Sequence, residues 1–395
     1  MKQNWTFKSL YILLFAIYSN AVIAQSEFNT ESGNLIKLSL KTEVGHEDNF
    51  LFSNTNELAT SYFILMPKIE VQAQFERQLF SVEAISQHRK YQDFAKDDHS
   101  NFTLSPRYQY RLAENKGLFI NTTLKNIYQR RGTGLSLGNG ASISKGDELK
   151  TTDVSGGYIF GTKESVTKFK IEVGSYESSY QTRRDITYLL DRKNNYADIT
   201  LDYLLSGQTY IASNIGYEKI TSNYNSLLDN EKYIALIGIK WQATEISQFD
   251  LLLGYQEIKF DESTFTDDSA FKWRLNYNWH PLYFTKISLR TERDFKEANR
   301  LSNSYRVVDN YDIEIKSSFT DFFEAVAVIG INQEEIVYQH TTEKEDYIFS
   351  NLTLNYKQNE WLSFYIQYDY SDLDSTEFEY NYQRNSISMG FNVSM

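Results

Sequence analysis

Residues 271–280 read Phe-Lys-Trp-Arg-Leu-Asn-Tyr-Asn-Trp-His, in which an apolar or aromatic side chain alternates with a polar one. Because successive side chains of a strand point to opposite faces, this period of two predicts a β-strand with one apolar face and one polar face. Residues 36–44, 68–75 and 362–370 show the same period. Alternation alone fits either a soluble β-sandwich, whose apolar faces form a core, or a membrane barrel, whose apolar faces contact lipid.

Strand length favours the barrel. The pattern predicts eighteen strands, most of them longer than ten residues. Strands of soluble proteins average about 5–6 residues, whereas a tilted membrane strand needs about 9–11. The first nine strands are predicted near 35–45, 59–76, 79–89, 101–112, 118–130, 149–160, 166–178, 196–206 and 208–219. The second nine are predicted near 231–243, 248–259, 270–280, 282–294, 306–318, 322–336, 346–357, 360–371 and 383–395.

The connections between these strands alternate between short and long, as periplasmic turns and extracellular loops do. The sequence therefore predicts an all-β chain that forms a single antiparallel transmembrane β-barrel of about eighteen strands. Pro67 and Pro106 fall inside the second and fourth predicted strands. Since each proline removes a donor from the strand ladder, each is expected to mark a bulge or a misplaced boundary.

The N-terminal residues predict export. Lys2 and Lys8 precede a short apolar run from Leu10 to Ile17, and the segment ends with a small residue, Ala24. This pattern predicts a signal peptide over residues 1–24, with the barrel over 25–395. No later segment is apolar over the length of a spanning helix, so a helical membrane protein is excluded. The expected location is the outer membrane of a Gram-negative bacterium, in contact with lipid and lipopolysaccharide.

Composition narrows the function classes. Aromatic residues make up 15 % of the chain, there are 3 prolines and no cysteine, and the net charge is −12. This composition is typical of membrane barrels, and the acidic balance argues against nucleic acid as a partner. No motif with the spacing of a nucleophilic or metal site occurs, so neither catalysis nor a cofactor or metal is expected.

The polar faces of the strands are predicted to line the lumen. The basic residues that we favour as contacts to an anionic or hydroxyl-rich polymer are Arg107, Arg111, Lys240, Lys272, Arg274, Lys286 and Arg290. The alternative is a neutralised, water-filled interior without specificity. Acidic residues of the predicted loops, among them Glu47, Asp48 and Asp97, fit either a solvated acidic surface or a site for divalent cations.

A glycine-rich segment, residues 132–140, reads Gly-Thr-Gly-Leu-Ser-Leu-Gly-Asn-Gly. A strand follows it rather than a helix, which argues against a phosphate-binding loop. One interpretation is a flexible third external loop. The other is a constriction loop that folds inward and narrows the pore, as third loops do in general porins, with Gly132, Gly134, Gly138 and Gly140 as its flexible positions.

The opening segment, Leu35 to Phe52, runs into an acidic Asp48-Asn49 pair followed by apolar residues, and Pro67 stands in the next strand. In these features the chain resembles outer-membrane β-barrel porins associated with exopolysaccharide biosynthesis and export operons. The resemblance implies a channel for export of an exopolysaccharide or capsular polysaccharide, with a periplasmic polysaccharide-export protein as a partner. The alternatives are a general diffusion porin for small solutes and a structural or adhesive barrel.

Overall fold

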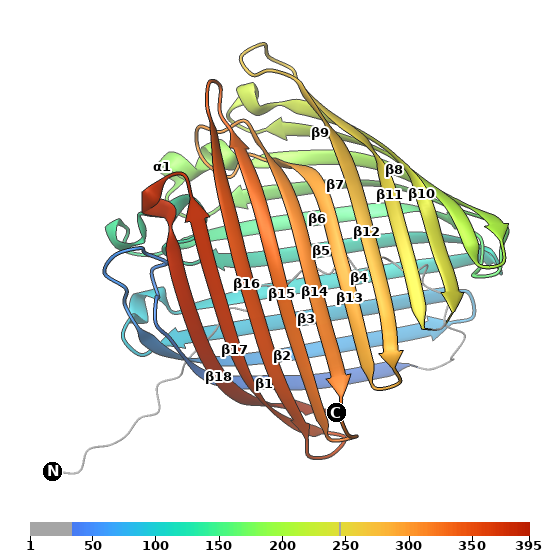
Figure 1. Ribbon diagram of the computed structural model, residues 1–395, viewed down its shortest axis with the longest axis horizontal. Coiled ribbons are helices and arrows are strands. Elements are labelled where there is room, and N and C mark those ends of the chain that lie inside the picture. Colours follow the sequence, from blue (N-terminus) through green and yellow to red (C-terminus); the bar gives the residue numbers. More distant parts are fainter. Residues whose placement is uncertain (1–33, 245) are drawn as a thin grey trace.

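The computed structural model describes residues 34–244 and 246–395 as a closed barrel of eighteen antiparallel strands (Figure 1). The first nine strands are β1 (Leu35–Glu47), β2 (Thr60–Phe75), β3 (Gln78–Tyr91), β4 (His99–Ala113), β5 (Lys116–Gln129), β6 (Asp147–Phe160), β7 (Thr167–Tyr180), β8 (Arg192–Ser206) and β9 (Thr209–Ser222). The second nine are β10 (Asn230–Thr244), β11 (Ser247–Phe260), β12 (Asp268–Leu282), β13 (Thr285–Glu297), β14 (Tyr305–Ser318), β15 (Phe323–Val337), β16 (Thr342–Lys357), β17 (Leu362–Ser375) and β18 (Tyr382–Ser394).

Each strand pairs with its neighbours in sequence, and β1 pairs with β18 from Ser39↔Ser394 to Glu47↔Ser386, which closes the sheet. The predicted fold class and the predicted number of strands are confirmed. Within the described residues, no helix is long and apolar enough to cross a membrane. The predicted signal peptide, residues 1–24, lies outside the described residues.

Nine external loops connect the strands at one end, which we call the loop end; the other end is the turn end. The loops are loop 1 (48–59), loop 2 (92–98), loop 3 (130–146), loop 4 (181–191), loop 5 (223–229), loop 6 (261–267), loop 7 (298–304), loop 8 (338–341) and loop 9 (376–381). They carry the short helices η1 (Ala95–Asp97), η2 (Gly134–Ser136), η3 (Gly140–Ser142), α1 (Arg184–Thr187), η4 (Tyr188–Leu190), η5 (Ser226–Leu228) and η6 (Phe378–Tyr380).

Several strands extend further toward the loop end than predicted, so the loops are shorter than predicted. Loop 8 has four residues, for example, where residues 337–345 were expected. The difference in length between turns and loops is therefore smaller than the sequence suggested, because strand pairing continues further toward the loop end.

The two faces of the sheet differ in chemistry as alternation predicts. On β1 the outward side chains of Ile36, Leu38 and Val44 are exposed, whereas Glu43 points inward and is buried. The registers carry this assignment around the barrel, since paired residues share a face. The apolar face contacts lipid, and the polar face surrounds the lumen.

The two prolines correct an expectation. Pro67 pairs with Leu40 of β1, and Pro106 pairs with Val82 of β3. On the other side of each proline the pairing lapses for two residues and then resumes in the same register. Neither proline marks a bulge or a strand boundary, because the lost hydrogen bond is confined to one side of the strand.

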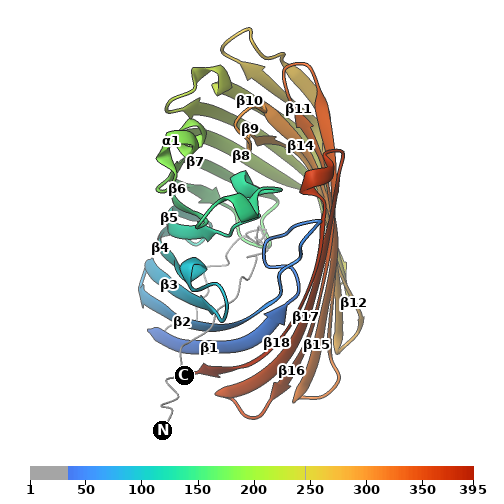
Figure 2. The same cartoon turned by 90° about the vertical axis from the view of Figure 1, so that its left-hand side faces the viewer.

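One junction departs from a regular wall. β12 and β13 pair from Leu282↔Thr285 up to Arg274↔Glu292 and no further. Residues 268–273 of β12 and 293–297 of β13 are therefore not paired with each other. β12 stays paired with β11, and β13 stays paired with β14. Figure 2 looks toward the loop end and shows β14 lying inward of β11 there.

Candidate channel lumen

The register places all seven predicted basic residues on the lumen face. Arg107 and Arg111 are on β4, Lys240 is on β10, and Lys272 and Arg274 are on β12. Lys286 and Arg290 are on β13. These residues share the lumen face, as their alternation predicts. Which of them form ion pairs depends on their neighbours.

Two of the seven are neutralised by carboxylates on nearby strands. The Lys240 Nζ lies 2.9 Å from both carboxylate oxygens of Asp202 on β8. Lys272 is buried and forms an ion pair with Asp294 of β13. Because these charges are satisfied within the wall, they are poorly placed to attract a solute.

Four others, Arg107, Arg274, Lys286 and Arg290, form no ion pair within the described part of the chain. Arg274 lies on β12, and Lys286 and Arg290 lie on the adjacent β13. β4, which carries Arg107, is on the opposite side of the lumen, since half of the eighteen strands separates it from β13. These candidates therefore lie on two facing sides of the lumen, where acids accompany them: Glu292 is directly opposite Arg274 in the ladder, and Asp312 is directly opposite Arg290.

Tyrosines form a second set of lumen residues that the sequence analysis did not single out. The register points Tyr62, Tyr176, Tyr196, Tyr210, Tyr347 and Tyr365 inward. Their hydroxyls bond polar groups of the wall, as in Tyr196 to Asp153 (3.2 Å) and Tyr365 to Glu43 (2.7 Å). Each of these tyrosines alternates with outward-facing residues of its strand. This alternation is the sequence signal that could have identified them as lumen residues.

Some of these rings lie over glycines. A Cβ on Gly45 would come within 2.2 Å of the Tyr62 ring, and one on Gly174 within 2.4 Å of the Tyr196 ring. Each glycine is directly opposite its tyrosine in the ladder. The glycines let the rings lie flat against the wall, which keeps the lumen open.

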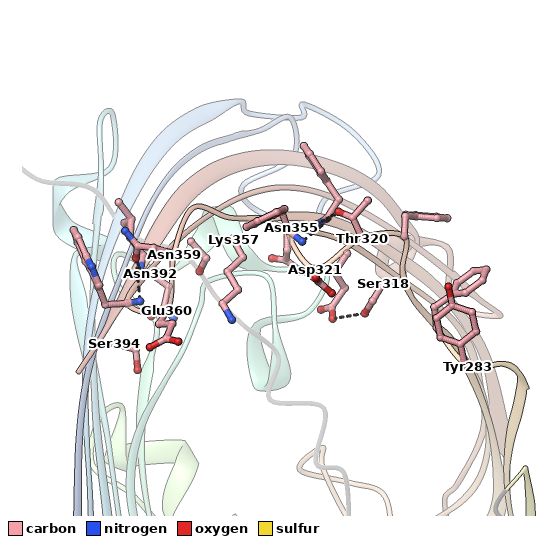
Figure 3. Close-up of a pocket in the computed structure, with 18 residues that line it drawn as sticks. Tyr283, Ser318, Thr320, Asp321, Asn355, Lys357, Asn359, Glu360, Asn392 and Ser394 are labelled. Carbon is pink, nitrogen blue, oxygen red and sulfur yellow. Dashed lines mark hydrogen bonds between the residues drawn. The ribbon is translucent and has the colours of Figure 1, made fainter.

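A cavity of about 700 Å³ opens at the turn end of the barrel (Figure 3). It is lined by the turns before β13, β15 and β17 and by the end of β18. Aromatic side chains at this rim are exposed, with Tyr283 at 98 % and Phe319 at 66 %. Polar groups such as Asp321 and Lys357 stand among them, so the mouth presents both aromatic and hydrogen-bonding surface.

The loop end is covered by the loops themselves. Loops 1 and 3 are joined at Glu47, whose carboxylate is fully buried and receives hydrogen bonds from Arg130 at the start of loop 3 and Arg384 of β18. Arg130 also lies over the Phe52 ring, 4.9 Å from its centroid. This arrangement fixes the base of loop 3 to the first and last strands.

Loop 3 then extends across the ring of strands (Figure 2). A Cβ on Gly132, which has φ +78°, would lie 1.7 Å from the carbonyl oxygen of Leu51, so loop 3 rests directly on loop 1. Gly138, with φ +73°, lies against Tyr380 of loop 9 in the same way. Of the four predicted glycines, Gly134 also has a positive φ, and Gly140 lies against Gly132.

Loops 4, 5 and 7 meet in a second contact of the loop end. Leu190, Leu228 and Ala298, from loops 4, 5 and 7, form an apolar cluster with Tyr180 at the end of β7, and Leu135 of loop 3 packs on it. Such a cluster removes apolar surface from water at the point where the loops converge.

Arg300 of loop 7 links the cap to β16. It forms ion pairs with Glu343 and Glu345 of β16 and lies over the Tyr380 ring, 4.3 Å from its centroid. Burial opposes its charge, but Glu345, Tyr338 and Glu343 raise the pKa of its guanidinium above the usual value. The described loops thus form one connected cap, which we call the loop cap.

The loop cap corrects the interpretation of two acidic residues. Glu47 and Asp97 were expected on a solvated acidic surface or in a cation site. Instead both are buried, and Asp97 accepts hydrogen bonds from Arg131 at 2.8 and 2.9 Å. No group of three or more possible metal ligands occurs among the described residues. Arginine neutralises these acids because the cap excludes water from them.

A family model described as "Putative beta-barrel porin 2" matches residues 33–395, which include all eighteen strands of the barrel. The chain belongs to this family. As a barrel porin it is a protein of the Gram-negative outer membrane, with its turn end in the periplasm and its loop end outside the cell. Membership of this family points to transport rather than catalysis.

Solved structures similar to this barrel porin include receptors and transporters. The siderophore receptor PirA from Pseudomonas aeruginosa is 10 % identical, with 92 % of the porin and 81 % of the receptor covered and a TM-score of 0.47. The FrpB iron transporter from Neisseria meningitidis is 8 % identical, with 90 % and 81 % covered and a TM-score of 0.48. No curated protein matches the sequence.

Proposed function

We propose that this barrel porin is the outer-membrane channel through which an exopolysaccharide or capsular polysaccharide leaves the cell. The observation that carries the proposal is the lumen lining, which combines inward tyrosines with basic residues on β4, β12 and β13. A passive channel of this kind needs no cofactor, and the energy for export comes from polymer synthesis or from the periplasm.

The lining suits a hydrated glycan. Tyrosine rings offer flat apolar faces to the C–H surfaces of sugar rings, and their hydroxyls exchange hydrogen bonds with sugar hydroxyls. Arg107, Arg274, Lys286 and Arg290 would attract the carboxylate or phosphate groups of an acidic polymer. An eighteen-stranded barrel is also wide enough to hold an aqueous path. Arg111 belongs to the same proposed set through its place on β4.

The periplasmic mouth suits an entry site. Exposed aromatic residues at its rim, such as Tyr283 and Phe319, lie beside Asp321 and Lys357. This mixture favours a partner that delivers the polymer, and a periplasmic polysaccharide-export protein is the proposed one. The loop cap is consistent with a channel that stays closed until the polymer arrives from this side.

Deletion of the gene in its host tests the proposal. We expect surface polysaccharide to fall and periplasmic polysaccharide to rise, with both restored by the intact gene. Complementation with the double variant Arg274→Glu, Arg290→Glu should restore export poorly. A control that reverses two outward-facing charges, Lys193→Glu with Lys344→Glu, should restore it fully, since those side chains lie outside the lumen.

Unchanged polysaccharide in the deletion strain would reject export. The diffusion porin would then be tested by uptake of small solutes into vesicles that contain the protein. Loss of cell adhesion without any loss of conductance would instead favour the structural or adhesive barrel.

A further inference from the structure

Residues 293–307 form the loop-end tip of β13 and β14. This tip lies on the lumen side of β11 and β12 instead of continuing the barrel wall beside β12. Alternation points Phe295, Tyr305 and Val307 outward, because their neighbours Asp294 and Arg306 fall on the lumen face. Yet all three are at least 94 % buried, and they pack on Ile258 of β11. Ile258 is an inward residue. The outer face of the tip therefore rests against the inner face of β11 and β12.

Side chains replace the backbone partners that β12 would supply. The N–H of Phe295 donates to Gln256 Oε1 at 3.1 Å, and the Phe295 carbonyl accepts from Lys232 Nζ at 3.2 Å. Gln256 and Lys232 belong to β11 and β10, beyond the strand that the tip has left. Buried backbone groups need partners, so these two side chains make the inward position of the tip possible.

The tip also reaches across the lumen. Glu297 forms ion pairs with Lys232 at 2.7 Å and with Arg192 of β8 at 3.4 Å. Arg192 also donates to the carbonyl of Ala298 at 3.2 Å. Since β8 is five strands from β13 around the ring, the tip occupies the space over that part of the lumen.

The sequence also fits a second arrangement, in which β12 and β13 pair along their full length. Continuing the register beyond Arg274↔Glu292 would bring Lys272 opposite Asp294 and Phe271 opposite Phe295. The first pair is already an ion pair, and the second would be an aromatic pair on the outer face. Trp273, with its Nε1 donating to Thr291 at 3.0 Å, lies at the fork between the two arrangements.

We propose that residues 293–307 form a gate, which closes the lumen when tucked against β11 and opens it when zipped onto β12. This inference rests on the proposed channel and states how it is regulated. In the tucked arrangement, Gln256 and Lys232 bond the backbone N–H and carbonyl of Phe295. In the zipped arrangement, the backbone of β12 would bond them, so neither state leaves these groups without partners.

Two disulfides that share one position test the gate, and the chain has no native cysteine to interfere. Ile258→Cys with Phe295→Cys is the pair chosen for the tucked arrangement, because both residues belong to the same buried cluster. Phe271→Cys with Phe295→Cys can cross-link only after the tip has moved to the outer side of β12. Paired strand residues are within the Cα spacing that a disulfide needs.

Conductance of KCl through purified protein in planar bilayers is the measurement, and it needs no polysaccharide. We expect the oxidised 258–295 variant to conduct severalfold less than after reduction. The 271–295 variant should cross-link in membranes and conduct severalfold more when oxidised. The gate is overturned if 271–295 never cross-links, if reduction leaves both conductances unchanged, or if neither variant conducts in either state.

A milder variant guards against misfolding of the cysteine pairs. Gln256→Leu removes the acceptor for Phe295 and keeps the side chain's size, so openings should become more frequent. Gln367→Leu is the control, since Gln367 faces the lumen from β17 and bonds Asp369 rather than the tip. Equal opening frequencies for the two leucine variants would count against the gate. Unchanged polysaccharide in the deletion strain, together with normal gating of the purified protein, would reject the proposed substrate alone.

Discussion

At the scale of single residues, the decisive groups are charged side chains buried among the loops. Glu47, Arg130 and Arg384 come from β1, loop 3 and β18, and the carboxylate of Glu47 has both arginines as partners. Removing one member of such a buried group is costly because the others remain charged and lose their partner. The loop cap therefore depends on a few residues more than on its total contact area.

Glu47→Gln should release loops 1 and 3. By the usual cost of breaking a buried ion pair, about 3–5 kcal/mol of local stability should be lost. Limited proteolysis from the extracellular side should then cut both loops much faster than in the native protein. Glu57→Gln, in the exposed part of loop 1, is the matched control and should leave cleavage unchanged. Equal cleavage of the two variants would contradict the role given to Glu47.

At the scale of elements, alternation predicts the strands well because a barrel wall has the same two environments along its whole length. It fails at the tip of β13 and β14, where Phe295 and Val307 are assigned to lipid but are buried beneath β11. The error has a physical cause. Periodicity reports which side of its own strand a residue is on, but not whether another strand covers that side.

Loop 3 shows the same limit. Its glycines indicated a chain able to turn sharply, and three of them have positive φ values. The sequence did not indicate that Gly132 rests on Leu51 or that Leu135 joins the cluster of loops 4, 5 and 7. Those contacts depend on the closed ring, which brings distant parts of the chain together.

Shortening loop 3 by deletion of residues 133–143 should raise the single-channel conductance in planar bilayers, because the deleted segment extends over the lumen. A matched variant that keeps the length but replaces the same residues by Gly and Ser should also raise it, through loss of the contact between Leu135 and its cluster. Conductance equal to that of the native protein in both variants would refute the constriction loop.

At the scale of the whole molecule, the candidate basic residues lie on opposite sides of the ring, with Arg107 on β4 and Arg274 and Arg290 on β12 and β13. The candidate residues could be predicted as lumen residues from alternation. The ion pairs of Lys240 and Lys272 could not be predicted, because Asp202 and Asp294 become their neighbours only through the registers.

The basic residues on the two sides of the lumen should act independently on ion selectivity. Arg274→Glu with Arg290→Glu on one wall, and Arg107→Glu on the other, should each shift the reversal potential in a KCl gradient toward cation selectivity. The combined variant should show close to the sum of the two shifts, since separated sites contribute additively and salt screens them from each other. Reversal of Lys240, whose charge Asp202 already neutralises, should have a smaller effect. A shift of the reversal potential in the variants of one side only would contradict this prediction.

The contact of Glu47 with both Arg130 and Arg384 has a consequence for the order of assembly. Glu47 belongs to the first strand and Arg384 to the last, so the two meet only when the sheet has closed on itself. Closure of the ring and sealing of its outer end are then a single late event during biogenesis. A nascent barrel that is held open between β1 and β18 would present an unsealed mouth to the cell exterior, however complete its other seventeen strand pairings were.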